Sequence, residues 1–241
     1  MLSLHVETKL CVPGDCDDVG AVCLAHALMI RGEAKLLAVV HNTGLDTGVG
    51  AISAINTYYG QPVPIGAYKG QFDKGLRGPY VDDLARNFPN KIQHARQAAD
   101  ALTVYRQALA KAPNHSVWIS SIGFTTNLEA LLRSVPDEES PLNGTDLVRL
   151  KVRGLAWMGG RYPNSHNVPG QPHLPSPEHN FGFHCRVNTP RCNNISSAPI
   201  GPSTAYVYEH WPATVPIVFL GCAIASGVIT FVSLYVFVQS V

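Results

Sequence analysis

The sequence predicts an α/β fold: a single domain whose mostly parallel sheet is covered by helices on both faces. Strand-like and helix-like segments alternate along most of the chain, and short connections join them. A length of 241 residues suits one α/β domain or two small ones, with a sizeable core. We find no internal repeat and no low-complexity linker, which favours one domain.

The alternation starts with a helix over 17–32, which opens with acidic residues and closes at Gly32. Strands are expected at 35–41, 62–67, 116–123 and 154–160, and helices at 46–60, 98–112 and 125–134. The helix at 98–112 is the clearest, because Leu102, Tyr105 and Leu109 recur at helical spacing. Asp46 is expected to cap the second helix. Loops are expected over 70–90 and 161–176, and segments 204–212 and 215–221 complete the series.

Composition excludes several classes of protein. Lys and Arg number 18 against 17 Asp and Glu, so the net charge of +1 provides no basic field for nucleic acid. A disordered tail, a collagen-like repeat and a disulfide scaffold are also excluded. Six cysteines without a C-x-x-C pair indicate reduced thiols. The first ten residues lack the pattern of a signal peptide, so we expect a cytoplasmic protein.

The C-terminal segment 215–241 has 27 residues and no charge, which is long enough to span a bilayer. One alternative is a transmembrane helix that inserts into a membrane and makes the protein membrane-associated. The other is a buried parallel strand, PIVFLG, followed by an aberrant tail. We therefore divide the chain into a divergent N-terminal segment (1–13), a main domain (14–214) and the apolar segment (215–241).

Polar side chains gather just after the expected strands, where ligands bind in open α/β sheets. These side chains are Asp15, Asp17 and Asp18, then Asn42, then Thr126, and finally Glu178 and Asn180. Each of them alone is explained by a helix cap, a turn or a solvated loop. Three aspartates within four positions repel one another, however, and a divalent cation with oxygen ligands would relieve that repulsion.

Residues 14–21, GDCDDVGA, resemble the acidic signature of the inosine/uridine-preferring nucleoside hydrolases. The segments VVHNTG, SIGFTTNL, WMGG, PEHNFG and VPIVFLG follow in the order of that family, so the resemblance covers roughly residues 14–230. It implies a parallel-sheet α/β domain that hydrolyses the N-glycosidic bond of ribonucleosides. In that family a bound Ca²⁺ activates the attacking water, and nearby negative charge stabilises an oxocarbenium-like transition state.

The resemblance also implies roles for individual residues. It assigns the carboxylate of Asp18 and the carbonyl of Thr126 to the metal, with Asp15 as a substitute ligand. The residues that it assigns to the ribose pocket are Asp17, Asn42, Met158, Glu178 and Asn180. The implied partner is a small-molecule nucleoside. A homo-oligomer remains open, and so does the preferred base.

The chain departs from the family at both ends. Where the family has D-x-D, this chain has Lys9, Leu10 and Cys11, and Cys11 occupies the position of the aspartate that binds calcium and activates water. No aspartate follows Asp146, so the last calcium ligand of the family is also missing. We therefore expect no intact catalytic residue, weakened calcium binding and impaired hydrolysis. The alternatives are a non-catalytic module that binds ribose or nucleosides, and a membrane-tethered interaction protein.

Overall fold

A computed structural model of the chain describes residues 2–8, 17–70, 79–159, 180–181 and 200–220. Its strands are β1 (Leu2–Thr8), β2 (Ala34–His41), β3 (Ile65–Ala67), β4 (Ala99–Asp100), β5 (Val117–Ser121), β6 (Val152–Met158) and β7 (Ile217–Leu220). Its helices are α1 (Asp17–Ile30), α2 (Gly48–Tyr58), α3 (Pro79–Asn87), α4 (Ala101–Lys111), α5 (Thr126–Arg133), α6 (Gly144–Lys151) and α7 (Ile200–His210), with a 3₁₀ turn, η1, at Ala95–Gln97.

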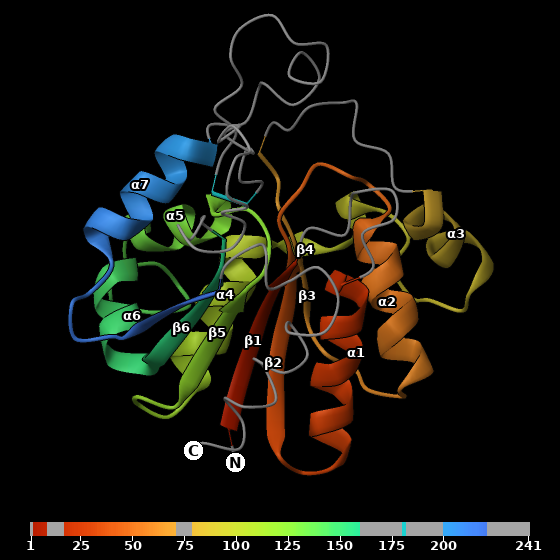
Figure 1. Ribbon diagram of the computed structural model, residues 1–241, viewed down its shortest axis with the longest axis horizontal. Helices are drawn as coiled ribbons and strands as arrows, with labels where there is room; N and C mark the ends of the chain where they lie inside the picture. Colours follow the sequence, from red (N-terminus) through yellow and green to blue (C-terminus); the bar gives the residue numbers. More distant parts are fainter. Residues whose placement is uncertain (1, 9–16, 71–78, 160–179, 182–199, 221–241) are drawn as a thin grey trace, which may run out of the picture.

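The strands form one sheet in the order β4-β3-β2-β1-β5-β6-β7, and every pairing between them is parallel. Helices α1, α2 and α3 cover one face, and α4, α5, α6 and α7 cover the other (Figure 1). This arrangement confirms the predicted single α/β domain with a parallel sheet between two helical layers. Parallel strands need crossover connections, and the helices between successive strands provide them.

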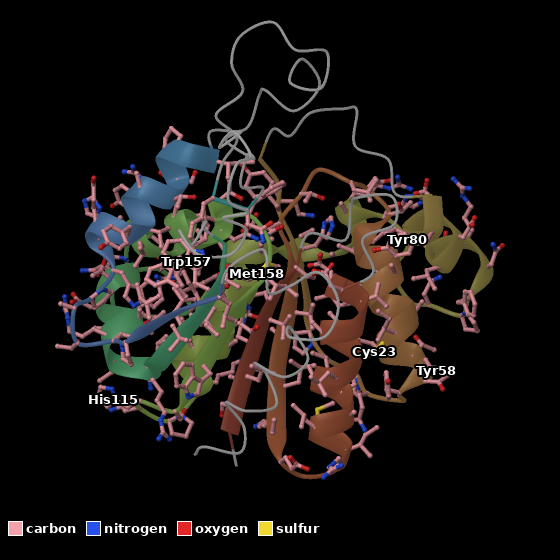
Figure 2. The ribbon with its side chains drawn as sticks, viewed as in Figure 1. Cys23, Tyr58, Tyr80, His115, Trp157 and Met158 are labelled. Carbon is pink, nitrogen blue, oxygen red and sulfur yellow. The ribbon has the colours of Figure 1, made fainter. Side chains whose placement is uncertain are left out.

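The core consists of two apolar layers, one on each side of the sheet. Val39 packs in the layer under α1, α2 and α3, whereas its neighbour Val40 packs in the layer under α4 to α7. Met158 and Trp157 of β6 divide in the same way (Figure 2). Because successive residues of a strand point to opposite faces, a strand buried on both sides is mostly apolar.

The acidic cluster was expected to follow a strand, but the bounds of that strand and its central place in the sheet were not predicted. β1 lies within the segment 1–13 that we treated as divergent, and it pairs with β2 on one side and β5 on the other. Ser3, His5 and Thr8 are buried in it, so it does not read as an apolar segment. Helix α6 was not expected either, and helix α3 occupies part of 70–90, where the prediction of a loop was wrong.

The predicted capping role of Asp46 was also wrong. The residue that precedes α2 is Thr47, which makes no side-chain capping bond. The Asp46 carboxylate instead accepts a hydrogen bond from the backbone of Ala95 at 2.9 Å and contacts Nδ1 of His94 at 2.6 Å. It therefore fastens the segment before β4 to the loop that follows β2.

The C-terminal segment is described only to residue 220. Residues Ile217–Leu220 form β7, parallel to β6, as the strand alternative expects. The strand is not buried as that alternative expects, because Phe219 is 38% exposed and the other three residues are partly exposed. Residues 221–241 lie outside the described residues. Among the residues that are described, no helix has both the length and the apolar character needed to cross a membrane.

The connection between α5 and α6 is held against α4 by the buried side chain of Arg106. Its guanidinium donates to both carboxylate oxygens of Asp137, at 2.6 and 2.8 Å, and to the hydroxyl of Ser134 at 2.7 Å. It also donates to the carbonyls of Ser140 and Leu142. These hydrogen bonds from Arg106 lower the pKa of Asp137 below its usual range.

Candidate functional site

The candidate site lies at the carboxyl ends of the strands, where the order of the sheet reverses. From β1 the chain builds outward through β2, β3 and β4, and then returns to place β5 on the other side of β1. In open parallel sheets, ligands usually bind at the carboxyl ends of the strands where the strand order reverses in this way. Described residues from α1, β2, α5 and β6 supply predicted site residues at this end.

Asp18 and Asn42 are connected through Thr8, the last residue of β1. The hydroxyl of Thr8 donates to Oδ1 of Asp18 at 2.7 Å, and the carbonyl of Thr8 accepts from the backbone N–H of Asn42 at 3.0 Å. All three residues are buried. Asp17, the first residue of α1, is half-buried beside Asp18 in the chain. The end of β1 thus binds the carboxylate of Asp18 through the hydroxyl of Thr8 and the backbone N–H of Asn42 through the carbonyl of Thr8.

The side chain of Asn42 is held in one orientation. Its Nδ2 donates to the carbonyl of Phe124 at 2.8 Å, in the loop between β5 and α5. Its Oδ1 is buried and accepts no hydrogen bond from the described residues. A buried acceptor without a donor costs about 1–3 kcal/mol, so this oxygen is suited to a donor from outside the described chain.

Asn180 also bonds to the loop between β5 and α5. Its Nδ2 lies 3.1 Å from each of three acceptors, which are the carbonyl of Ile122 and the carbonyl and Sδ of Met158. Met158 ends β6 and is buried, as is Asn180. Phe181 packs its ring 4.7 Å from that of Trp157, which anchors this short segment on β6. Asn42 and Asn180 therefore bond to carbonyls only two residues apart.

Thr126 is the first residue of α5 and is buried. Its Oγ1 has no hydrogen-bond partner among the described residues. The preceding Thr125 lies 3.0 Å from Oγ1 of Thr204 in α7, and Asn127 reaches the carbonyl of His41 at 3.5 Å. The beginning of α5 is thus fastened both to α7 and to the end of β2.

Hydrogen bonds through Thr8 and the loop after β5 connect four of the predicted residues, which are Asp18, Asn42, Met158 and Asn180. Thr126 begins α5 just after this loop, and Asp17 begins α1 beside Asp18. The predicted residues Cys11, Asp15 and Glu178 lie outside the described residues. Thr8 and the carbonyls of residues 122 and 124 also belong to the site, and the sequence analysis did not find them. Thr8 could have been found as the last residue of a strand before the acidic cluster, but backbone carbonyls leave no signal in a sequence.

The described residues were tested as a calcium site by their donor atoms. Calcium takes six to eight oxygen ligands. Within the described ranges, no group of three or more His, Cys, Asp or Glu side chains lies together as metal ligands would. Asp17 and Asp18 are the acidic residues at the start of α1, and the carbonyl of Thr126 is the other predicted donor. These donors alone do not make a complete calcium site.

Tyr68 follows β3 at the same end of the sheet. Its backbone N–H donates to the carbonyl of His41 at 2.9 Å. Burial raises the pKa of its hydroxyl, and the negative charge of Glu129 raises it further. Glu129, in the first turn of α5, accepts hydrogen bonds from Arg133 at 2.8 Å and from Ser203 of α7. Tyr68 is therefore a protonated hydrogen-bonding group at neutral pH.

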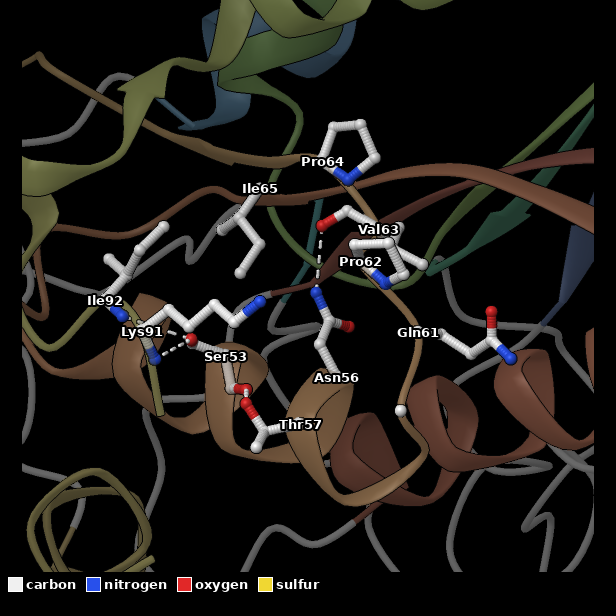
Figure 3. A pocket seen from close by; sticks show the side chains of 11 residues that line it. Ser53, Asn56, Thr57, Gln61, Pro62, Val63, Pro64, Ile65, Lys91 and Ile92 are labelled. Carbon is white, nitrogen blue, oxygen red and sulfur yellow. Dashed lines mark hydrogen bonds between the residues drawn. The ribbon is translucent and has the colours of Figure 1, made fainter. Parts of the chain in front are cut away.

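A separate cavity of about 530 Å³ lies at the opposite end of β3 (Figure 3). Its lining residues are Ser53, Asn56, Thr57, Gly60, Gln61, Pro62, Val63, Pro64, Ile65, Lys91 and Ile92. Ser53 accepts from two backbone N–H groups, and Asn56 donates to the carbonyl of Val63 while contacting His26. These polar groups are used within the protein, and none of the predicted site residues lines this cavity.

Comparison with known proteins identifies the fold. No protein-family model and no curated protein sequence matches the chain. The type III effector protein XopQ, solved in complex with adenosine diphosphate ribose, is 18% identical, with a TM-score of 0.58 over 91% of this chain and 56% of that one. The plant nucleoside hydrolase PpNRh1 is 14% identical, with a TM-score of 0.52 over 92% of this chain and 60% of that one.

The chain therefore has a nucleoside hydrolase-like fold. It spans between half and two thirds of the length of these two proteins. Identities this low establish the fold and not the activity, because one fold carries many functions.

Proposed function

We propose that this chain is a nucleoside hydrolase-like protein that binds the ribose of a ribonucleoside and hydrolyses its N-glycosidic bond weakly or not at all. The observation that carries the proposal is the orientation of Asn42, whose Nδ2 is bound to the carbonyl of Phe124 while Oδ1 remains a buried acceptor. A sugar hydroxyl can donate to such an oxygen. The fold shared with PpNRh1 and XopQ supports a ligand that contains a nucleoside.

The ribose is bound, in this proposal, by acidic and amide side chains together. Asp17 and Asn42 accept from adjacent hydroxyls, and Asn180 and Met158 close the pocket from the side of β6. Glu178, two residues before Asn180, adds a further carboxylate. Each of these two acceptors takes one hydroxyl, so a vicinal diol is favoured over an isolated hydroxyl. The hydrogen bond to Asp17 is the stronger one, because a charged acceptor binds a neutral donor more strongly than a neutral acceptor does.

Calcium is proposed to bind weakly, through Asp18 and the carbonyl of Thr126, with Asp15 as a further ligand. Bound calcium would supply a water of lowered pKa at the sugar. We assign no catalytic step to it, because the donors among the described residues do not complete a calcium site and Cys11 stands where the family resemblance expects a carboxylate base. The presence of Cys11 at that position is the reason to expect slow hydrolysis.

Isothermal titration calorimetry with inosine, uridine and adenosine diphosphate ribose tests the binding. We expect the full chain to bind at least one of them, and Asn42→Ala to weaken that binding about 10-fold or more. The matched control is Asn87→Ala at the exposed end of α3, which should leave the affinity unchanged. Absence of binding to all three ligands would contradict the proposal.

Release of free base from inosine and uridine, with and without millimolar calcium, tests the activity. We expect turnover far below that of PpNRh1 measured in the same assay. Turnover equal to that of PpNRh1 would show that the predicted impairment is wrong, although the ribose site would stand.

A further inference from the structure

The loop after β5 binds both asparagines of the candidate site. The carbonyl of Ile122 accepts from Asn180 at 3.1 Å, and the carbonyl of Phe124 accepts from Asn42 at 2.8 Å. Gly123 lies between these two carbonyls. Nothing in the proposed function gives this glycine a role, yet it lies directly beside the amide of Asn42.

The reason for a glycine at this position is space. A Cβ atom at Gly123 would lie 2.4 Å from Nδ2, 2.7 Å from Oδ1 and 3.0 Å from Cγ of Asn42. Real Cβ atoms essentially never approach a neighbour within 3.0 Å. The φ angle of Gly123 is not positive, so the backbone conformation does not itself require glycine. Any side chain here would displace the amide of Asn42.

The amide cannot move away without losing its hydrogen bond. Asn42 is fully buried, and its Nδ2 is already bound to the carbonyl that follows Gly123. Because Gly123 has no side chain, the amide of Asn42 can pack against the loop with Nδ2 facing the carbonyl of Phe124. This orientation determines that Oδ1 is the atom left to accept from a ligand.

We propose that Gly123 is a positioning residue, which orients Asn42 so that the site presents an acceptor to a ligand hydroxyl. This inference rests on the proposed function, because the ligand that it concerns is the ribose of a ribonucleoside. It adds that the distinction between a hydroxyl and a hydrogen on the sugar depends on a glycine packed against the amide of Asn42. Gly123→Ala should reduce that distinction while the other ribose contacts remain.

The test is a double-mutant cycle between Gly123→Ala and Asn42→Ala, measured by calorimetry with inosine, 2′-deoxyinosine and 3′-deoxyinosine. We expect Gly123→Ala to weaken inosine about 3- to 10-fold and to change the affinity for one of the two deoxynucleosides much less. In the Asn42→Ala background the same substitution should have no further effect. Gly201→Ala in α7 is the control, because a Cβ there meets nothing within 4 Å.

Two results would overturn the inference while leaving the proposed function intact. One is an equal loss for inosine and both deoxynucleosides. The other is an undiminished effect of Gly123→Ala in the Asn42→Ala background, which would mean that Gly123 acts on the fold and not through Asn42. Failure of the wild-type chain to bind any nucleoside would instead remove the proposed function, and with it the ligand-facing role.

The same double-mutant cycle, measured as Tm by thermal melting, tests without any ligand whether Gly123 positions Asn42. Gly123→Ala should lower the Tm of the wild-type chain by several degrees and leave the Tm of Asn42→Ala nearly unchanged, because the smaller side chain makes room for the new methyl group. Additive effects on Tm would show that Gly123 does not position Asn42.

Discussion

His5 makes the stability of the fold depend on pH. It lies in the central strand β1, between Ala38 of β2 and Ile119 of β5, and its ring stacks on Tyr105 with centroids 3.8 Å apart. Both ring nitrogens are buried and make no hydrogen bond within the described part of the chain. Burial lowers the pKa of His5 from 6.5 to about 3, so the folded protein holds a neutral imidazole at neutral pH.

The direction of the effect follows from the lowered pKa. Between pH 6.5 and about 3 the unfolded chain binds a proton at His5 that the folded chain does not bind. The stabilisation is therefore complete above pH 6.5 and decreases as the pH falls toward 3. The whole interval corresponds to about 4–5 kcal/mol, of which about 2 kcal/mol is lost between pH 7.5 and pH 5.

The assay is urea unfolding of the wild-type chain and of His5→Phe at several values between pH 5 and pH 7.5. Phenylalanine keeps an aromatic ring against Tyr105 but cannot bind a proton. We expect the free energy of unfolding of the wild type to fall by about 2 kcal/mol more than that of the variant over this range. The lowered pKa of His26 acts in the same direction in both proteins and cancels in the comparison.

His210→Gln is the control, because His210 lies exposed at the end of α7. Its pH dependence should follow that of the wild type. If His5→Phe and the wild type lose the same free energy of unfolding between pH 7.5 and pH 5, then His5 is not buried as a neutral group and the reasoning is refuted.

Two further substitutions test contacts that support the fold and the site. Arg106→Met should lower the free energy of unfolding, measured in urea, by about 2–4 kcal/mol, because the carbonyls that accept from the guanidinium would lose their hydrogen-bond donor. Arg149→Met, which removes an exposed pair, should cost under about 1 kcal/mol; equal losses would contradict the assigned role of Arg106. Thr8→Val should cost about 1.5–3 kcal/mol by removing the donor to Asp18, and should weaken nucleoside binding. Thr8→Ser keeps the hydroxyl and should restore both, so a serine variant as impaired as the valine variant would contradict this.

The layered fold could be predicted because periodicity and connection length are local signals. The alternation after Asp17 specified the crossover connections, and therefore a parallel sheet with helices on both faces. The same reasoning expected Asn42 directly after a strand, and β2 does end at His41. These features depend only on residues that are near one another in the sequence. Met158 was named only through the family resemblance.

The parts that could not be predicted depend on distant residues. β1 carries buried polar residues, and it is a central strand only because β2 and β5 pair with it. Asp46 was expected to cap a helix, but its carboxylate contacts His94 and the backbone of Ala95, far along the chain. The orientation of the Asn42 amide is likewise set by the carbonyl of Phe124, which follows 82 residues later.

The position of β1 also has a consequence for how the molecule folds. β1 precedes the other described strands in the chain, yet its partner β5 begins only at Val117, and no other described strand joins the two halves of the sheet. Pairing of strands that are so far apart in the sequence slows folding, because the entropy cost of closing the loop comes before any stabilising contact forms. Until β5 arrives, one edge of β1 is open to pairing with other chains. The slowest productive step of folding should therefore be the union of the two halves across this strand.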